Sequence, residues 1–378
     1  MDAKRKMLMI LALAGLAVGA FGVVEALMHG TNATALTSSV PWGLGVVVYL
    51  YFLGLSAGAF LVSILVYVFG LKRYEPLGKI AAWAVVVTEV CAGGAIALDL
   101  GRWGRMYRFV LSPSLDSPML WMFVFFTLLL VIYLLKIKAI TQGCDECVRK
   151  LSIVALPVGL LFYGTNGYFF SVLASRPIWN NPLVPFQFVL AALLTGGALL
   201  AVLALAFPPE GDDYDGLMRG LGKSILFLLV VFLLVEAVTI TSGLKSGKAD
   251  VVVAINAVVC GPRWWSFWII HLVLGGLLPF LLLVKNGSGP RDVCQAGLLI
   301  LATFPFARYD FVIPAQGLPM LPGLDTAFIH PRLSLSYSPD MGEWLVTVFF
   351  LALALFGFLI GPKLIPALFG SKEGDAHA

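Results

Sequence analysis

The chain has 378 residues, of which 60% are hydrophobic and 12% are charged, and its formal net charge is +4. A soluble domain is roughly 45–50% apolar and about 25% charged. With a mean hydropathy of +0.95, the composition excludes a soluble globular protein, a disordered chain and a disulfide-stapled secreted module. It predicts an all-α, polytopic membrane protein.

Ten stretches of the chain are apolar, and most reach the roughly 20 residues that a spanning helix needs. They cover 7–28, 42–71, 80–98, 118–135, 151–173, 183–207, 221–244, 264–284, 293–307 and 343–365. The first has about 22 residues, longer than a signal-peptide core, so we interpret it as a retained anchor helix. No segment between the stretches is long enough for a soluble domain, so we expect one integral membrane domain.

The lysines and arginines predict the orientation, because cytoplasmic loops carry the excess of positive charge. With a cytoplasmic N-terminus, sixteen of these residues, Lys136 among them, fall on the cytoplasmic side and nine on the other. The nine are Arg102, Arg105, Arg108, Arg176, Lys245, Lys248, Arg263, Arg308 and Arg332. We therefore expect a multi-pass protein of the cell membrane with both termini in the cytoplasm.

A faint internal repeat relates two parts of the chain. Segments 85–102 and 232–248 each have one glutamate, then a glycine, then a charged residue at the outer end. Parallel repeats of this kind occur in membrane proteins. The repeat predicts two four-helix bundles, over residues 42–173 and 183–307. An outer loop, 29–41, precedes them, and a last helix, 343–365, follows them.

The predicted outer loops differ in composition from the inner ones. Segments 99–108, 175–182 and 308–323 are rich in Trp, Arg, Pro and Asn, whereas inner loops such as 208–216 resemble solvated connectors. Ordered aromatic loops fit a docking surface or the entrance of a site. They equally fit an aromatic belt at the membrane interface combined with loop packing.

Three of the few ionisable side chains in the apolar runs lie well away from the run ends, where a charged group costs several kcal/mol and is a functional candidate by default. Glu89, Glu236 and His271 all lie seven to nine residues from the outer end of their runs. At about 1.5 Å per residue they share one layer, about 10–14 Å below the outer surface. Such groups either pass protons or bind a polar ligand; the alternative is a neutral hydrogen bond between packed helices.

Further polar residues gather at the predicted outer ends of the first bundle. Asp99 and Arg102 are spaced i, i+3 and can touch on one helical turn. Together with tyrosines and an asparagine they predict a pocket open to lipid near the outer face. A quinone suits such a pocket, since its ring needs hydrogen-bond partners and its tail needs lipid. The candidate binding residues are Tyr49, Asp99, Arg102, Tyr163, Asn166 and Tyr168.

The sequence offers few ligands for a redox centre. Only His271 lies within a predicted span, whereas two b-haems across a bilayer need four histidines on helices. Cys144 and Cys147 form a lone CxxC, and an iron–sulfur cluster or a structural zinc needs four ligands. No nucleotide-binding motif and no basic, aromatic-interleaved patch for nucleic acid occurs. We expect no haem and no iron–sulfur cluster in this chain.

Several segments resemble, in their order along the chain, those of a known family. They are PWGLGVVVYLYFLGLSAGAF (41–60), DLGR (99–102) with SPMLW (117–121), RPIWNNPLVPFQFVLAALLTG (176–196) and FWIIHLVLGGLLPFLLL (267–283). These resemble the NrfD/PsrC-type family of membrane quinone-interacting subunits. RYDFVIPAQGLP (308–319) and YSPDMGEWLVTVFFLALALFG (337–357) are similar to its ten-helix branch, which includes DsrP and its Hme and Hmc relatives.

The resemblance implies a subunit, linked to sulfur metabolism, that binds menaquinone or another quinone near the extracytoplasmic face. It implies electron exchange with a ferredoxin-like iron–sulfur subunit docked outside. Further implied partners are a multihaem cytochrome c, a membrane cytochrome b and a cytoplasmic iron–sulfur subunit. Family quinone sites use polar residues at the outer ends of the first bundle, which correspond here to Asp99, Tyr49 and the stretch 163–168. The family's first-bundle helix often carries Asn or His where this chain has Val47, Val48 and Tyr49.

We interpret the chain as a quinone/quinol-interacting membrane subunit of a respiratory, menaquinol-linked oxidoreductase complex. Protons would pass through Asp99, Glu89 or their neighbours. One alternative is a secondary transporter or other ion-translocating protein, which the repeat and the mid-membrane glutamates would suit. Another is a structural anchor for redox subunits. A proton path through Glu236 and His271 would need polar residues towards the inner side, where the sequence shows few.

Overall fold

The structure is a computed structural model that describes residues 3–30, 34–71, 74–101, 103–105, 107–208, 213–285, 288–319, 323 and 330–369. The described residues form helices and loops without a strand, and ten helical segments are long and apolar enough to span a membrane. The prediction of an all-α polytopic membrane protein with about ten spans is therefore confirmed. The spans, in chain order, are α1 (Ala3–His29), α2 (Leu44–Tyr67), α3 (Glu75–Asp99), α5 (Pro118–Thr141), α6 (Asp145–Ser171), α7 (Leu183–Ala206), α8 (Tyr214–Leu244), the π-helical η4 (Ser266–Leu277) continued by α10 (Leu278–Val284), α11 (Pro290–Val312), and α13 (Met341–Leu364).

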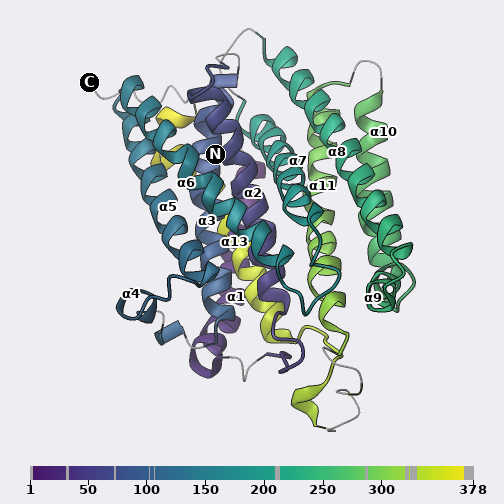
Figure 1. Cartoon of the computed structure of the whole chain (residues 1–378). Helices are drawn as coiled ribbons and strands as arrows, with labels where there is room; N and C mark the ends of the chain where they lie inside the picture. The colour runs from purple at the N-terminus through teal and green to yellow at the C-terminus, as the bar shows by residue number, and fades with distance from the viewer. Residues whose placement is uncertain are drawn as a thin grey trace.

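Three short helices lie at one end of the molecule. α4 (Arg108–Leu111), α9 (Ala249–Val259) and η6 (Pro331–Leu333) gather at the lower end in Figure 1, where α2 begins and α3 ends. We call this the predicted outer end, after the charge count, and the opposite end the predicted inner end. The inner end includes the turn before α6, where Cys144 and Cys147 form a disulfide that the sequence did not predict.

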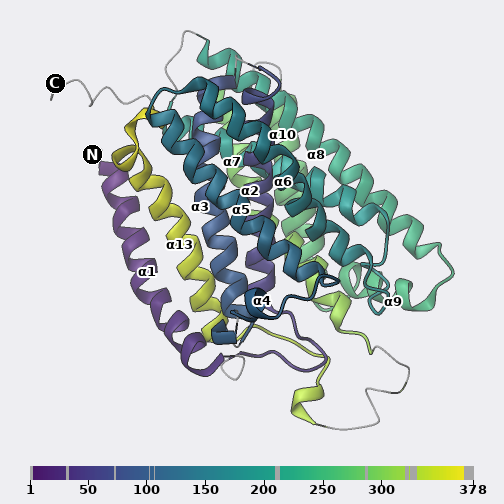
Figure 2. The ribbon, with the colours of Figure 1, turned by 60° about the vertical axis from the view of Figure 1, so that its left-hand side comes forward.

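The helices pack in two groups with a pair at one side. α2, α3, α5 and α6 contact one another, as do α7, α8, the η4–α10 helix and α11. α1 and α13 run side by side against α3 at the edge of the molecule, as Figure 2 shows. The centre is formed by α2 and α7, in which 83% and 78% of the most apolar stretch is buried, against 17% in α1 and in α8.

The two central helices cross at a pair of glycines. A Cβ atom on Gly58 of α2 would lie 2.0 Å from the carbonyl oxygen of Ala192 on α7. A Cβ on Gly196 of α7 would lie 2.3 Å from the Cα of Gly58. Small residues allow membrane helices to approach this closely, because apolar burial alone does not drive helices together in lipid. The glycine pair therefore sets the distance between the two groups of helices.

α11 is longer than the sequence predicted. The predicted run ended at residue 307, and Arg308 was assigned to an outer loop, but the helix continues to Val312. Arg308 and Asp310 are only 6% and 9% exposed, because they face neighbouring helices. Lys136, assigned to an inner loop, is likewise fully buried in α5. Both corrections have one cause: the charges interrupt the apolar pattern, although the backbone remains helical.

Candidate functional site

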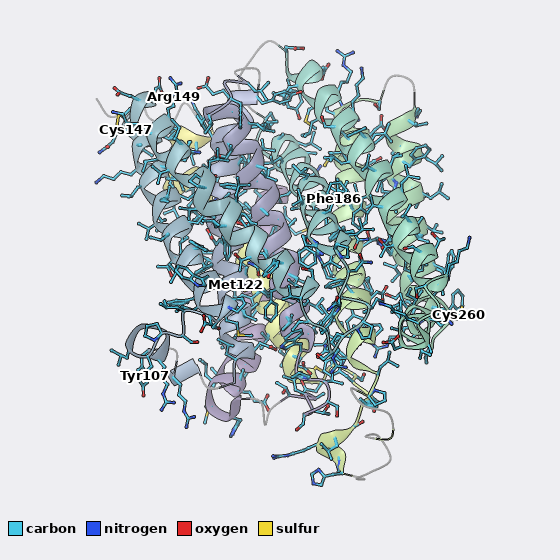
Figure 3. All side chains as sticks on the ribbon, viewed as in Figure 1. Tyr107, Met122, Cys147, Arg149, Phe186 and Cys260 are labelled. Carbon is cyan, nitrogen blue, oxygen red and sulfur yellow. A yellow bond between two sulfur atoms is a disulfide. The ribbon has the colours of Figure 1, made fainter. Side chains whose placement is uncertain are left out.

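A lipid-facing crevice of about 950 Å³ lies between α2, α3, α5 and α6, towards the predicted outer end. We call it the outer crevice. Its lining is almost entirely apolar and aromatic, and the exposed side chains of Leu100 and Met119 lie at its edge. Figure 3 labels Met122, one of the residues that α5 contributes. The lining residues are Trp42, Val46, Tyr49, Gly93, Ile96, Ala97, Leu100, Met119, Met122, Phe123, Phe126, Phe162, Phe169 and Phe170.

An aromatic wall closes the crevice at the start of α2. The Trp42 ring stacks on Trp179 with centroids 5.2 Å apart and meets the rings of Phe169 and Phe170 at 5.7 Å each. The Trp42 backbone is held by the Gln316 side chain, whose oxygen accepts from its N–H at 3.0 Å and whose amide donates to its carbonyl at 2.8 Å. A wall fixed in this way offers flat apolar surfaces to a planar ring.

The predicted outer loop 175–182 packs inward. Arg176 is 5% exposed, and its guanidinium donates to the carbonyls of Ser39 and Leu318 at 3.0 Å each. Burial lowers the pKa of Arg176 from its ordinary value. Trp179, on the same loop, is 1% exposed and donates from Nε1 to the Phe311 carbonyl at 2.8 Å. Arg176 and Trp179 therefore pack within the protein, as the alternative of loop packing predicts.

Tyr49 is the polar residue of the crevice. It lies five residues into α2, about 8 Å along the helix from Leu44. Its hydroxyl donates to Oδ1 of the fully buried Asn166 on α6. Asn166 is oriented by its own amide, which donates to the Phe162 carbonyl at 2.8 Å. The Tyr49 hydroxyl oxygen therefore keeps a lone pair that can accept a hydrogen bond from a ligand O–H.

Glu89 lies deeper in the same group of helices. It is fully buried, and neither carboxyl oxygen has a hydrogen-bond partner among the described residues. Tyr49, Tyr133 and Tyr163 are near enough to feel its charge. The Tyr163 hydroxyl in turn lies 2.8 Å from Oγ of Ser56. A buried carboxyl without a partner is costly in a membrane, so this position favours a role in proton exchange over simple helix packing.

The other predicted first-bundle residues lie elsewhere. Asp99 ends α3 and does not line the outer crevice; its Oδ1 packs on Gly45, where a Cβ would come within 2.5 Å. Tyr168 is 57% exposed on α6 and does not line the crevice either. Tyr163 lines a different crevice, between α6 and α7. Arg102 lies outside the described residues.

Glu236 and His271 meet each other but not Glu89. His271 Nε2 lies 2.8 Å from Glu236 Oε2, in the group of helices formed by α7, α8, η4–α10 and α11. Nearby, Ser266 donates to Oδ2 of Asp310 at 2.9 Å. The three residues predicted to share one layer thus belong to two separate clusters, one with Glu89 and one with Glu236 and His271. Within the described residues, no three His, Cys, Asp or Glu side chains are arranged to hold a metal ion.

Two buried cations could not be recognised from the sequence. The Lys136 ammonium donates to Ser63 Oγ at 2.6 Å and lies 4.4 Å from the centroid of the Tyr67 ring. Arg308 lies over the rings of Phe188 and Phe304. Both cations come directly after an apolar run, where a charge normally belongs to a loop. No signal in the sequence separates a buried cation from a loop cation at such a position.

Comparison with known proteins identifies the family. The family model described as "Polysulphide reductase, NrfD" matches residues 32–319. A selenate reductase subunit of Mesobacillus selenatarsenatis is 27% identical in an alignment that covers 95% of this chain and 93% of the relative. The Hdr-like menaquinol oxidoreductase integral membrane subunit of Archaeoglobus fulgidus is 29% identical, with 94% of this chain and 92% of the relative covered. A polysulfide reductase subunit of Wolinella succinogenes is 25% identical, covering 74% and 95%. The resemblance seen in the sequence is confirmed: the chain belongs to the NrfD polysulphide reductase family.

Proposed function

We propose that the chain is the quinone/quinol-interacting membrane subunit of an electron-transfer complex, and that menaquinone or another quinone binds in the outer crevice. The observation that carries this proposal is the crevice itself. It opens at the lipid face, is walled by aromatic rings and contains one fixed hydroxyl, that of Tyr49. The name of the Archaeoglobus relative, a menaquinol oxidoreductase subunit, is consistent with a quinone ligand.

The quinone ring would lie against Trp42 and the phenylalanines of α6, while its tail leaves past Leu100 and Met119 into the lipid. In the quinol form, one ring hydroxyl would donate to the Tyr49 oxygen, whose own proton is held by Asn166. This arrangement supplies one directed hydrogen bond and a large apolar contact area, which is the usual composition of a small-molecule site.

Oxidation of a quinol releases two electrons and two protons. The electrons would pass to a ferredoxin-like iron–sulfur subunit docked at the predicted outer end, near the crevice. A multihaem cytochrome c, a membrane cytochrome b and a cytoplasmic iron–sulfur subunit would complete the assembly. In this proposal the protein lies in the cell membrane with both termini in the cytoplasm, as the distribution of Lys and Arg favours.

The protons would be taken up by this chain's own polar residues. Glu89 would relay protons from Tyr49, because its buried carboxyl group has no hydrogen-bond partner among the described residues and is free to exchange a proton. Towards the predicted inner end, Glu89 is followed by Tyr133 and then by Lys136, which lies 5.0 Å from the Tyr133 ring. These groups would connect the crevice with the inner end of the first group of helices. Asp99, at the outer end of α3, would exchange protons on the outer side.

Replacing Tyr49 with phenylalanine tests the binding site. The loss of the hydrogen bond that a quinol hydroxyl would donate to Tyr49 should cost about 1 kcal/mol of binding free energy. We therefore expect the KM for a short-tailed naphthoquinol, oxidised by the whole complex, to rise roughly five-fold or more. Tyr168→Phe is the matched control, because Tyr168 is exposed on α6 and does not line the outer crevice. Equal KM values for the two variants would contradict the assignment of Tyr49.

Replacing Glu89 with glutamine, or Asp99 with asparagine, tests the proton route. Each change keeps the shape of the side chain but removes a titratable group. For Glu89→Gln we expect kcat to fall by roughly 100-fold, the lower bound for loss of a positioned proton acceptor, with little change in KM. Turnover of the whole complex gives the measurement. Normal turnover in both variants would favour the structural-anchor alternative.

The transporter alternative has less support. Transporters of that kind bind substrate at discontinuous helices in matching positions of two repeats. α6 and α11, the last helices of the two groups, contain Pro157 and Pro305, but both helices continue through the proline. The Glu236–His271 pair is the feature that a transporter would use, and it lies away from the outer crevice.

A further inference from the structure

Arg308 places a guanidinium inside the last helix of the second group, α11, where neighbouring helices bury it. The side chain is only 6% exposed, and its Nη2 faces Gly54 of α2. Gly54 lies ten residues after Leu44, the first residue of α2, and therefore about 15 Å from the outer end of that helix. The Arg308 Nε has no hydrogen-bond partner among the described residues. No ion pair or hydrogen bond to its side chain is found within the described part of the chain. Two phenylalanine rings, with centroids 4.7 and 5.0 Å from Cζ, lie against the guanidinium.

Arg308 lines a second crevice, which we call the α6–α7 crevice. It has a volume of about 700 Å³ and is bounded by α2, α6 and α7, with apolar side chains on all three helices. Leu160 and Val189, which are 54% and 47% exposed, line it where it meets the lipid face. Its polar residues are Arg308 and Tyr163. Bare backbone at Gly164 leaves the crevice open, because no atom lies within 4 Å of a Cβ built there.

Glu236 does not neutralise Arg308. Both residues line a smaller cavity of about 400 Å³ on the other side of the guanidinium, between α7, α8 and α11. The Glu236 carboxylate is instead bound to His271 at 2.8 Å. A guanidinium presents five donors and stays charged, so an unpaired one in hydrocarbon requires an acceptor from another source.

We propose that the α6–α7 crevice binds a second membrane-soluble ligand, which presents a carbonyl or carboxylate oxygen to Arg308 and extends an apolar tail past Leu160 and Val189. An oxygen acceptor at the guanidinium forms a charge-assisted hydrogen bond, which is shorter and stronger than a neutral one. Two lipids have this chemistry, a quinone through its ring carbonyl and a fatty acid through its carboxylate. The site shares no lining residue with the outer crevice.

Binding of two probes distinguishes these sources. The full chain, with the subunits that accompany it, is placed in phosphatidylcholine nanodiscs with either a short-tailed naphthoquinone or oleate. Probe retained per chain is then measured by extraction and mass spectrometry. The comparison is made in an Ala97→Phe background, in which the outer crevice is filled, so that failure of the proposed function does not affect the result.

Two variants remove different parts of the site. Gly164→Leu places a side chain in the crevice from a position where an added Cβ meets no protein atom, and Arg308→Met replaces the guanidinium with an apolar side chain. We expect each of the two variants to lower the amount of one probe retained per chain about ten-fold or more. Ala237→Leu, on the exposed face of α8, is the control and should leave the retained amount of both probes unchanged. Loss of naphthoquinone identifies a second quinone site, and loss of oleate a fatty-acid site. If Gly164→Leu retains both probes as its parent does, the proposal is wrong, whether or not Arg308→Met folds.

Discussion

Replacing Ala97 with phenylalanine should reduce quinol oxidation by the whole complex by about 100-fold, an effect as large as the one expected for Glu89→Gln. Ala97 lines the outer crevice on α3, opposite the rings of α5 and α6. A benzyl group at this position occupies the space in which a quinone ring would lie, and an added ring excludes the ligand rather than weakening one contact. The measurement is naphthoquinol turnover in membranes, normalised to the amount of assembled complex.

Ala237→Phe is the matched control for this experiment. Ala237 lies on the exposed face of α8, so the added ring meets only lipid and should leave turnover unchanged. If Ala97→Phe assembles normally and oxidises quinol at the rate of the control, the outer crevice is not the substrate site. The comparison is sharp because both changes add the same apolar group to a membrane helix.

The second large effect concerns stability. Gly58→Ala places a methyl group 2.0 Å from the Ala192 carbonyl oxygen, where backbone rather than a flexible side chain must move. Overpacking typically costs about 1–3 kcal/mol, and this contact joins the two central helices of the molecule. We expect a clear fall in the thermal unfolding midpoint in detergent and a lower yield of folded protein.

Gly164→Ala is the control for this experiment, and its expected effect on stability has the opposite sign. Gly164 is also a glycine inside a membrane helix, but nothing lies within 4 Å of its built Cβ. Alanine is a better helix former than glycine by about 0.5–1 kcal/mol, so this variant should be as stable as the parent or slightly more so. A Gly58→Ala variant that unfolds at the same temperature as Gly164→Ala would show that the α2–α7 contact can relax.

The two crevices lie on different sides of α6. Phe162 lines the outer crevice, whereas its neighbour Tyr163 lines the α6–α7 crevice and contacts Ser56 on α2. The two crevices share no lining residue, so a ligand in one of them would leave the other free.

Tyr337 and Glu343, at the outer end, hold two helices together. The Tyr337 hydroxyl donates to Glu343 Oε1 at 2.5 Å, and it accepts from the Leu44 backbone N–H at 2.7 Å. Burial raises the pKa of Tyr337 above its ordinary value, and the nearby Glu343 adds to this. These bonds hold the start of α2 against the start of α13, and so they position Tyr49 in the crevice one and a half turns further along.

The amino-acid sequence by itself determined the class of the protein, the ten membrane spans and the family. Hydropathy along the chain is sufficient for the spans, because each helix satisfies its own backbone hydrogen bonds in lipid and needs only enough apolar length. The sequence also singled out Tyr49 and Asn166, which the structure brings together across α2 and α6.

Only the tertiary structure decided which polar groups share a site. Glu89, Glu236 and His271 lie at similar depths, yet depth along a helix does not specify the direction in which a side chain points, and the three are divided between two clusters. Arg308 and Lys136 resembled loop charges until neighbouring helices were seen to bury them. Burial depends on residues distant in the chain, so a crevice exists only once α2, α3, α5, α6 and α7 are packed together.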